Sequence, residues 1–116
     1  MTNSKDRVKV LKSLEDIDRL IHEPARLMIL THLYVVESAD FLFLKHQTGL
    51  TWGNLSSHID KLEAAGYVKI EKRFIDRKPR TTLHLTNEGR DAFKAYMQKM
   101  KEVIDRLPSE IDSPVQ

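Results

Sequence analysis

Apolar residues repeat with helical spacing near the start of the chain. Intervals of four, three and four residues separate Val10, Leu14, Ile17 and Ile21, and this spacing predicts a helix within residues 7–22. Pro24 disfavours helical geometry at the residue before it and suits the first turn of a new helix. Residues 25–37 (ARLMILTHLYVVE) are apolar almost all round, so we expect them to form a buried central helix.

Two shorter helices are expected next. Asp40 can cap the first, FLFLKHQT, and Gly49 can end it. Thr51 can cap the second, within TWGNLSSHIDKLEAAG, and Gly66 can end it. The short connection Gly-Leu-Thr between these helices is typical of a helix-turn-helix, which we place at residues 40–66.

After Gly66 the period of the pattern changes from 3.6 to 2, as in a strand. In YVKIEKRF we expect Val68, Ile70 and Phe74 on one face, opposite Tyr67, Lys69, Glu71 and Arg73. TTLHLT alternates again, with Leu83 and Leu85 on the inner side. The charged segment IDRKPR separates the two runs, so residues 67–86 predict a β-hairpin.

A long helix is expected at residues 87–107. Thr86 or Asn87 can cap it, and Glu88 is favourable in its first turn. Pro108 follows, and residues 108–116 form a polar tail that we expect to be flexible. The elements together predict one domain, residues 1–116, that is mainly α with a small β-hairpin (α+β). It has about five helices, with long ones at both ends.

Composition narrows the class of protein. The 116 residues include no cysteine, which excludes disulfides, thiolate metal sites and thiol nucleophiles. The charged N-terminus lacks the apolar stretch of a signal peptide, and no apolar run approaches the ~18 residues of a membrane span. We therefore expect a soluble, cytoplasmic protein. The net charge is only +2, but residues 69–80 hold six basic residues against two acidic ones, a local basic patch of the kind that nucleic-acid binders carry.

The helix within residues 51–66 has an unusual polar face. Its apolar stripe, expected to face the core, consists of Trp52, Leu55, Ile59 and Leu62. The opposite side carries Gly53, Asn54, Ser57, Lys61 and Ala64, with Ser56 and His58 on its flanks. Gly, Asn and Ser each cost roughly several tenths of a kcal/mol of helix propensity relative to Ala. The face is either an ordinary solvated surface or one that approaches DNA closely, where Asn can bond to an adenine edge.

Four cations gather near the turn of the hairpin beside a single acid, Asp76: they are Arg73, Arg77, Lys78 and Arg80. One interpretation is a charged turn that only maintains solubility. The other is a surface that pairs with phosphates or enters the minor groove, because Arg suits both. Pro79 stiffens the loop and so lowers the cost of ordering it on contact. A helix-turn-helix beside a basic hairpin indicates DNA binding more specifically than either feature does by itself.

The order of elements resembles the winged-helix transcriptional regulators of the MarR/ArsR type, over about residues 7–107. LTWGNLSSHIDKLEAAGYV is similar to the recognition helix of that group, and the matching positions are Ser56, His58, Ile59, Leu62, Gly66 and Tyr67. LTNEGR, residues 85–90, resembles the opening of the helix after the wing. The wing, residues 67–86, is one residue longer than the common MarR spacing, and RKPRT resembles a smaller single-domain subgroup. The resemblance implies a homodimeric repressor or activator that binds pseudo-palindromic operators.

The last helix also carries a seam of its own. Its members follow a four-three-four-three spacing typical of a coiled coil: Phe93, Met97, Met100, Ile104 and Leu107. The seam can pack on the first helix of the same chain or on a second chain. We expect a bundle shared by two subunits, to which the first helix contributes Val10, Leu14, Ile17 and Ile21. A dimer would place two recognition helices ~34 Å apart, about one turn of DNA.

No residue pattern points to catalysis or to a metal. The histidines are scattered without ligand spacing: His22, His32, His46, His58 and His84. No nucleophile elbow, phosphate loop or H-E-x-x-H motif is present. We therefore expect no enzyme activity, no metal site and no cofactor. A small-molecule effector stays open.

The sequence favours a dimeric DNA-binding regulator. We expect base reading by Trp52, Asn54, Ser56, Ser57 and His58. We expect backbone contacts from Thr51, Lys61, Arg73, Arg77, Lys78 and Arg80, with affinity that falls steeply as salt rises. The alternative is a winged helix that uses the same surfaces to hold an acidic partner protein.

Overall fold

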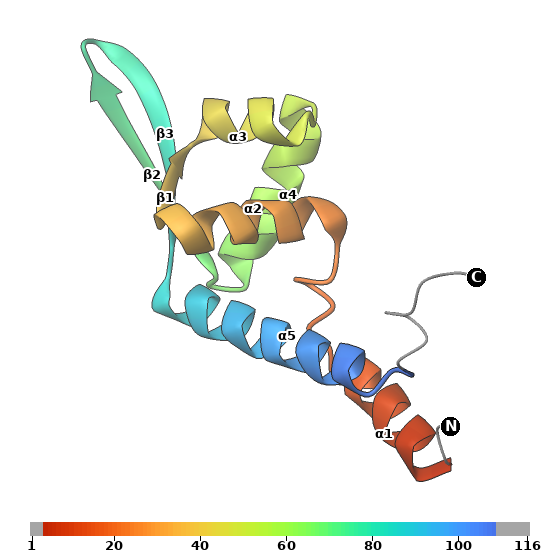
Figure 1. The fold of residues 1–116 in the computed structure, drawn as a ribbon. Helices are drawn as coiled ribbons and strands as arrows, with labels where there is room; N and C mark the ends of the chain where they lie inside the picture. Colours follow the sequence, from red (N-terminus) through yellow and green to blue (C-terminus); the bar gives the residue numbers. More distant parts are fainter. Residues whose placement is uncertain (1–3, 109–116) are drawn as a thin grey trace.

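The computed structural model describes residues 4–108, with side chains from residue 8 onward. Five helices and a three-stranded antiparallel sheet lie within that range, which confirms the predicted mainly helical α+β class. In Figure 1, α1 and α5 lie at one end of the molecule, the hairpin of β2 and β3 projects at the other, and α2, α3 and α4 lie between them. Residues 109–116 of the expected tail lie outside the described residues.

The first helix is shorter than its apolar spacing predicts. α1 spans Ser4–Glu15, whereas the prediction extended the helix to residue 22. The Asp18 carboxylate accepts the backbone N–H groups of Leu20 and Ile21, at 2.9 and 3.2 Å. A short polar side chain that bonds to nearby backbone in this way competes with the helix. Ile21 is nevertheless fully buried, because the turn brings it back onto the core.

α2 (Pro24–Val36) begins where the proline predicts. Pro24 occupies the first turn, and the Glu23 carboxylate accepts the N–H of Arg26 as the N-cap. The expectation of burial all round is wrong, since only one face, which includes Ile29 and Leu33, is buried. The other side stays exposed because no element of the described chain covers it. Its exposed residues include Met28, Val35 and Val36.

A third strand, β1 (Ser38–Asp40), was not predicted. It pairs with β3, with Ala39 opposite Leu83, and gives the sheet the order β1-β3-β2. Three residues are too few to show a period of two, and their partners lie more than 40 positions away. Asp40 also caps α3 (Phe41–Thr48) as predicted, since its carboxylate accepts the N–H of Leu42.

The helix-turn-helix is confirmed in its local details. Gly49 ends α3 with a left-handed φ of 69°, a conformation that glycine adopts at little cost. α4 (Trp52–Ala64) follows directly, and the hydroxyl of Thr51 accepts the N–H of Asn54 as its N-cap. Leu55, Ile59 and Leu62 are fully buried on its inner face.

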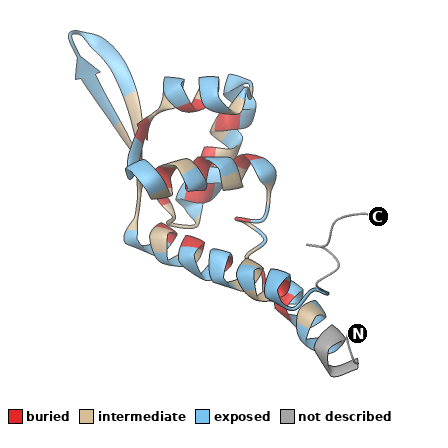
Figure 2. Cartoon of the chain, in the orientation of Figure 1, coloured by how far each residue is buried: buried red, intermediate tan, exposed pale blue. Residues whose placement is uncertain are grey.

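The hairpin consists of β2 (Val68–Ile75) and β3 (Lys78–Leu85). Val68 and Leu83 are buried at its base, and Ile70 and Leu85 pack partly against the core. Phe74 shares their face of the strand, as expected, but 79% of it is exposed, so it takes no part in the core. The hairpin extends past the helices, and its outer half therefore has nothing to pack against (Figure 2).

α5 (Asn87–Asp105) starts at a crowded junction. The Thr86 hydroxyl accepts the N–H of Gly89 at 2.9 Å and donates to the Gly66 carbonyl at 2.6 Å. A Cβ on Gly89 would overlap the carbonyl oxygen of Tyr67, so the start of α5 approaches the residue before β2 as only glycine allows. This close approach explains the glycine in LTNEGR. α5 ends two residues before the predicted Leu107.

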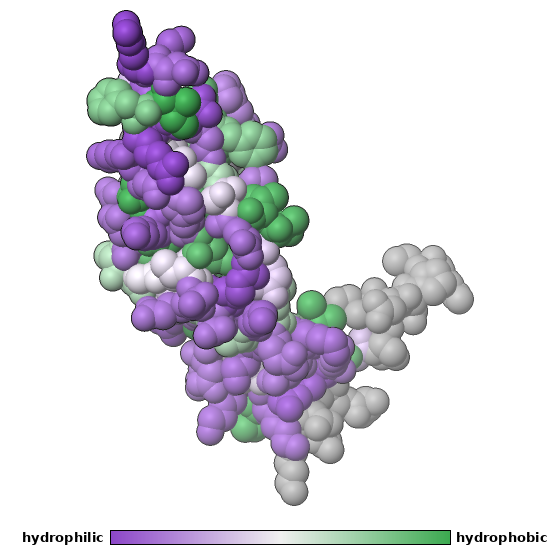
Figure 3. Space-filling model, turned by 90° about the vertical axis from the view of Figure 1, so that its left-hand side faces the viewer, coloured by the Kyte–Doolittle hydropathy of each residue, from purple (hydrophilic) through white to green (hydrophobic). Residues whose placement is uncertain are grey.

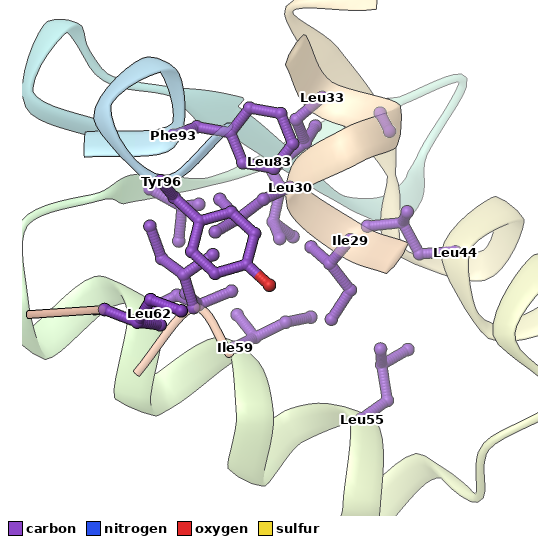
Figure 4. Packing of buried hydrophobic residues seen from close by; sticks show 14 residues of the cluster. Ile29, Leu30, Leu33, Leu44, Leu55, Ile59, Leu62, Leu83, Phe93 and Tyr96 are labelled. Atoms are coloured by element: carbon purple, nitrogen blue, oxygen red, sulfur yellow. The ribbon is translucent and has the colours of Figure 1, made fainter. Parts of the chain in front are cut away.

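One core joins the described elements. Side chains from α2, α3, α4, β3 and α5 converge there, among them Ile29, Leu44, Ile59, Leu83 and Phe93 (Figure 4). Tyr67, at the start of the wing, donates from its hydroxyl to the Asp18 carboxylate at 2.7 Å. That hydrogen bond, burial and the charge of Asp18 raise the pKa of Tyr67 to about 12. The bond ties the α1–α2 turn to the end of α4.

Candidate nucleic-acid interface

α4 presents an open polar face beside the hairpin. Gly53, Asn54 and Ser57 are exposed along it, and Lys61 is exposed one turn further on. These residues lie opposite the buried Leu55/Ile59/Leu62 stripe. The short side chains leave the helix backbone accessible to a flat or grooved partner.

Trp52 does not face the core, contrary to the prediction. It is 50% exposed, and its ring stacks on Phe41 with centroids 5.4 Å apart. The ammonium of Lys45 also lies over the indole, 5.2 Å from its centroid. Trp52 is the first residue of α4, so it lies beyond the part of the helix that the core covers. α3 holds it in place instead.

Two of the five predicted base-reading residues turn away from the open face. Ser56 is half-buried and lines a hollow of about 370 Å³ between α4 and the hairpin, together with Lys72 and Thr81. His58 is half-buried on the other flank, where its Nδ1 lies 3.1 Å from Arg26 Nη1 and 3.6 Å from Glu23 Oε2. The ring of His58 thus connects α4 to the start of α2, and 20% of its side chain stays exposed.

Glu23 is the centre of that small cluster. Burial raises the pKa of its carboxyl, but hydrogen bonds from the N–H groups of Arg26 and Ala25 lower it, as do the charges of His58 and Arg26, and the net pKa is below its usual value. Glu23 is thus an ionised cap that joins α2 and α4. Sequence reasoning missed this cluster because Glu23 and His58 are 35 positions apart and share no pattern.

The cations predicted on the hairpin are all exposed: Arg73, Arg77, Lys78 and Arg80. Arg73 contacts Glu71 on the same strand, and that guanidinium is the main cause that holds the pKa of Glu71 below its usual value. Arg80 Nε lies 3.9 Å from Asp40 Oδ1. Within residues 4–108, Arg77 and Lys78 make no ion pair, so they are available to a partner.

The turn of the hairpin is tight and conformationally demanding. Ile75 pairs with Lys78, which leaves a two-residue loop of Asp76 and Arg77. Their φ angles are 52° and 67°. Positive φ at both central residues is the pattern of a type I′ turn, which normally carries Asn-Gly or Asp-Gly. Here an arginine occupies the glycine position and projects its side chain at the very end of the hairpin.

A hollow of about 620 Å³ separates the hairpin from the starts of α3 and α4. Phe41 and Trp52 line it on the side of the helices, and Lys78 and Arg80 line it on the side of the hairpin. Basic and aromatic groups therefore face each other across a gap that is open to solvent. The hairpin is held above the helix-turn-helix rather than packed onto it.

Comparisons with known proteins agree with this geometry. Residues 25–104 match the family model described as a winged helix DNA-binding domain. The chain belongs to the winged helix DNA-binding domain family. In this family's terms α3 and α4 are the helix-turn-helix and the hairpin is the wing.

Named relatives support the same assignment. An uncharacterized protein of Methanocaldococcus jannaschii is 36% identical over 85 residues, 73% of this chain and 92% of that protein. A transcriptional regulator homologue from Pyrococcus horikoshii OT3 has a solved structure with a TM-score of 0.73 and 34% identity, covering 87% of this chain and 95% of that one. The structure of MarR shares the fold, with a TM-score of 0.66, 16% identity and coverage of 84% and 74%.

These comparisons confirm the winged-helix resemblance, and the chain shares its fold with the solved structures of MarR and of an ArsR family transcriptional regulator. The Pyrococcus horikoshii protein is described as a transcriptional regulator homologue, and the matching family model describes a DNA-binding domain. Within the described part of the chain, no three His, Asp or Glu side chains gather as they would around a metal ion. None of the described helices combines the length and apolarity of a membrane span.

The residues predicted at the dimer interface differ in burial: some are buried, some half-buried and some exposed. Ile17, Ile21 and Phe93 are 7%, 0% and 3% exposed, so their assignment to a dimer interface is corrected: they pack in the core of their own chain. Val10 and Met100 are half-buried. Exposed apolar residues remain on α1, on α5 and just after the end of α5, and α1 packs against α5. They are Val8, Leu11, Leu14, Met97, Ile104 and Leu107.

Proposed function

We propose that this winged-helix protein is a homodimer that binds specific sequences of double-stranded DNA and regulates transcription from a cytoplasmic location. The observation that carries the proposal is the open face of α4 beside a wing whose cations are exposed. Residues 7–22 and 87–107 would serve dimerisation, within a single domain. The proposed backbone contacts come from Thr51, Lys61, Arg73, Arg77, Lys78 and Arg80.

The proposed base contacts come from the open face of α4. Gly53 and Ser57 allow the helix to lie close to the floor of the major groove, and Asn54 can pair bidentately with an adenine. Trp52 can add an apolar edge at the start of the helix. Ser56 lies toward the wing, where a hydroxyl suits a phosphate better than a base.

The wing supplies affinity rather than sequence preference. Each phosphate neutralised by Lys or Arg releases counterions, so log K falls with log salt by about 0.9 for every such contact. Arg77 at the turn is the foremost cation and suits the narrow minor groove. The DNA strand between the two grooves would pass the hollow beneath the wing, where Lys78 and Arg80 face Trp52.

Dimerisation is proposed from the apolar residues that one chain leaves exposed. Val8, Leu11 and Leu14 recur every three residues on α1, and Ile104 on α5 is 56% exposed. A second copy would cover these side chains and present two α4 helices to one face of the DNA. Symmetric half-sites about one turn apart would follow.

The test begins with selection of bound sequences from a random DNA pool. With the selected duplex and a random duplex, Asn54→Ala should lose preference between them, while Gln98→Ala on α5 should not. Arg77→Ala should weaken both duplexes and flatten the salt slope, while Lys94→Ala should leave both unchanged. Equal effects of Asn54→Ala and Arg77→Ala on both duplexes would contradict the assignment. No salt-sensitive binding at micromolar protein would instead favour a protein-interaction module.

A further inference from the structure

The wing carries an apolar collar just behind its charged turn. We use this name for Phe74, Ile75 and Pro79. Phe74 is 79% exposed and Ile75 is 43% exposed, and Pro79 is exposed opposite Phe74 in the register of the hairpin. Hydrophobic surface near the outer end of the wing is visible in Figure 3, surrounded by hydrophilic surface.

The collar has no role in the core of the described chain. Among the described residues, Phe74 is the most exposed of the large apolar side chains. It lies four residues along β2 beyond Ile70, the last position of that strand that packs partly against the core. A solvent-exposed phenylalanine gives no stability to the fold, and an outer strand with apolar residues invites unwanted pairing. A binding role accounts for its presence where a folding role does not.

Charge indicates what the collar meets. Arg73 and Arg80 pair across the hairpin directly behind it, Lys78 pairs with Ile75 within it, and Arg77 lies in front of it. An apolar patch with cations behind it, beside it and in front of it fits a partner that is strongly anionic yet has apolar walls. Duplex DNA has this character in its minor groove, where phosphates line the rims and deoxyribose carbons form the walls.

The dimensions agree with such a contact. The minor groove is roughly 7.5 Å deep, and an antiparallel strand rises about 3.4 Å per residue. The collar begins one residue behind the turn, so it lies within the depth of the groove when Arg77 reaches the floor. The paired strands are about 4.8 Å apart in a groove of about 6 Å, so side chains on the wing must press on its walls.

We propose that Phe74, with Ile75 and Pro79 beside it, is a wedge that packs against the deoxyribose walls of the minor groove. This inference rests on the proposed DNA-binding function and adds a nonpolar contact to it. Apolar side chains inserted from the minor-groove side are a general means of gaining contact with deformed duplexes. The wedge supplies affinity that does not depend on counterion release, unlike that of Arg77.

The test measures binding to a fluorescently labelled, mixed-sequence 30-base-pair DNA duplex at several salt concentrations. Phe74→Ala should weaken binding about tenfold, as expected for roughly half-burying a phenylalanine side chain, with an unchanged salt slope. Phe74→Leu should retain most of the affinity. Arg77→Ala, the matched variant, should lower the slope by about 0.9. Because Phe74 is exposed, its variants should unfold at the temperature of the unmodified protein.

Different outcomes distinguish failure of the wedge proposal from failure of the proposed DNA-binding function. Unchanged affinity in Phe74→Ala, with Arg77→Ala weakened, would overturn the wedge alone. Equal losses on an RNA duplex of the same sequence would also overturn it, because the minor groove of RNA is wide and shallow. If the unmodified protein binds no duplex but binds phosphatidylglycerol vesicles through Phe74, both the wedge and the proposed function fail.

Discussion

Arg77 occupies a position where glycine would fold more easily, and replacing it with glycine tests why an arginine is there. Its φ is 67°, next to a φ of 52° at Asp76. A left-handed conformation costs an ordinary L-residue about 1–2 kcal/mol, while glycine adopts it freely. Part of this difference is offset by the larger conformational freedom of glycine in the unfolded chain. We expect Arg77→Gly to stabilise the wing by about 0.5–1 kcal/mol.

The same change should weaken DNA binding. Removing one cationic contact lowers the salt slope by about 0.9, which corresponds to an affinity loss of about eightfold at 0.1 M salt and about threefold at 0.3 M. At 0.1 M this is about 1.2 kcal/mol of binding free energy. Stability and affinity should therefore move in opposite directions, which a variant that simply damages the wing cannot produce.

Two measurements check this prediction. Hydrogen exchange of the paired amides near the turn reports local stability, and fluorescence anisotropy against a labelled duplex at 0.1 and 0.3 M salt reports affinity. Arg77→Ala is the companion variant, because it removes the charge but keeps the cost of positive φ. Both variants should lose affinity equally, and only Arg77→Gly should slow exchange. The reasoning is refuted if Arg77→Gly binds as the unmodified protein does, or if its wing amides exchange faster.

Three further predictions concern the packing that positions α4 and the wing, and the proposed dimer interface. Gly89→Ala should lower the free energy of unfolding, measured by urea denaturation, by about 2–3 kcal/mol. The new Cβ would overlap the Tyr67 carbonyl, and this cost outweighs the ~1 kcal/mol gain in helix propensity. A variant more stable than the unmodified protein would contradict this. Tyr67→Phe should lose about 1–2 kcal/mol with its hydrogen bond to Asp18. Since the folded pKa of Tyr67 is raised from 10.0 to about 12, that stabilisation is complete below pH 10 and lost as pH rises to about 12, so the difference in stability between the two proteins should shrink over this window. Ile104→Glu should convert the proposed dimer to monomer in sedimentation equilibrium, with Lys101→Glu as the exposed control; an unchanged mass would place the interface elsewhere.

Several features of this protein could be predicted because they depend on residues close together in the chain. The N-caps at Asp40, Thr51 and Thr86 each need only a side-chain oxygen and a backbone N–H two or three residues later. The left-handed end of α3 needs only Gly49. The period of the apolar residues similarly placed the inner face of α4 and the two long strands. The helix-turn-helix and the basic wing followed from these local signals.

The features that could not be predicted depend on contacts between segments far apart in the chain. β1 exists because it pairs with β3, more than 40 residues away, and three residues carry no pattern of their own. The orientation of His58 was set by Glu23 and Arg26 at the start of α2. Apolar spacing on a helix shows which face is covered, but not whether the same chain or another chain covers it.

The sequence by itself therefore determined the elements, their caps and the kind of surface that α4 and the wing present. Only the tertiary structure decided that Ile17, Ile21 and Phe93 belong to the core of one chain and that Phe74 stands free at the end of the wing. The physical reason is that local hydrogen bonds act over a few residues, whereas burial depends on where the whole chain brings its segments together.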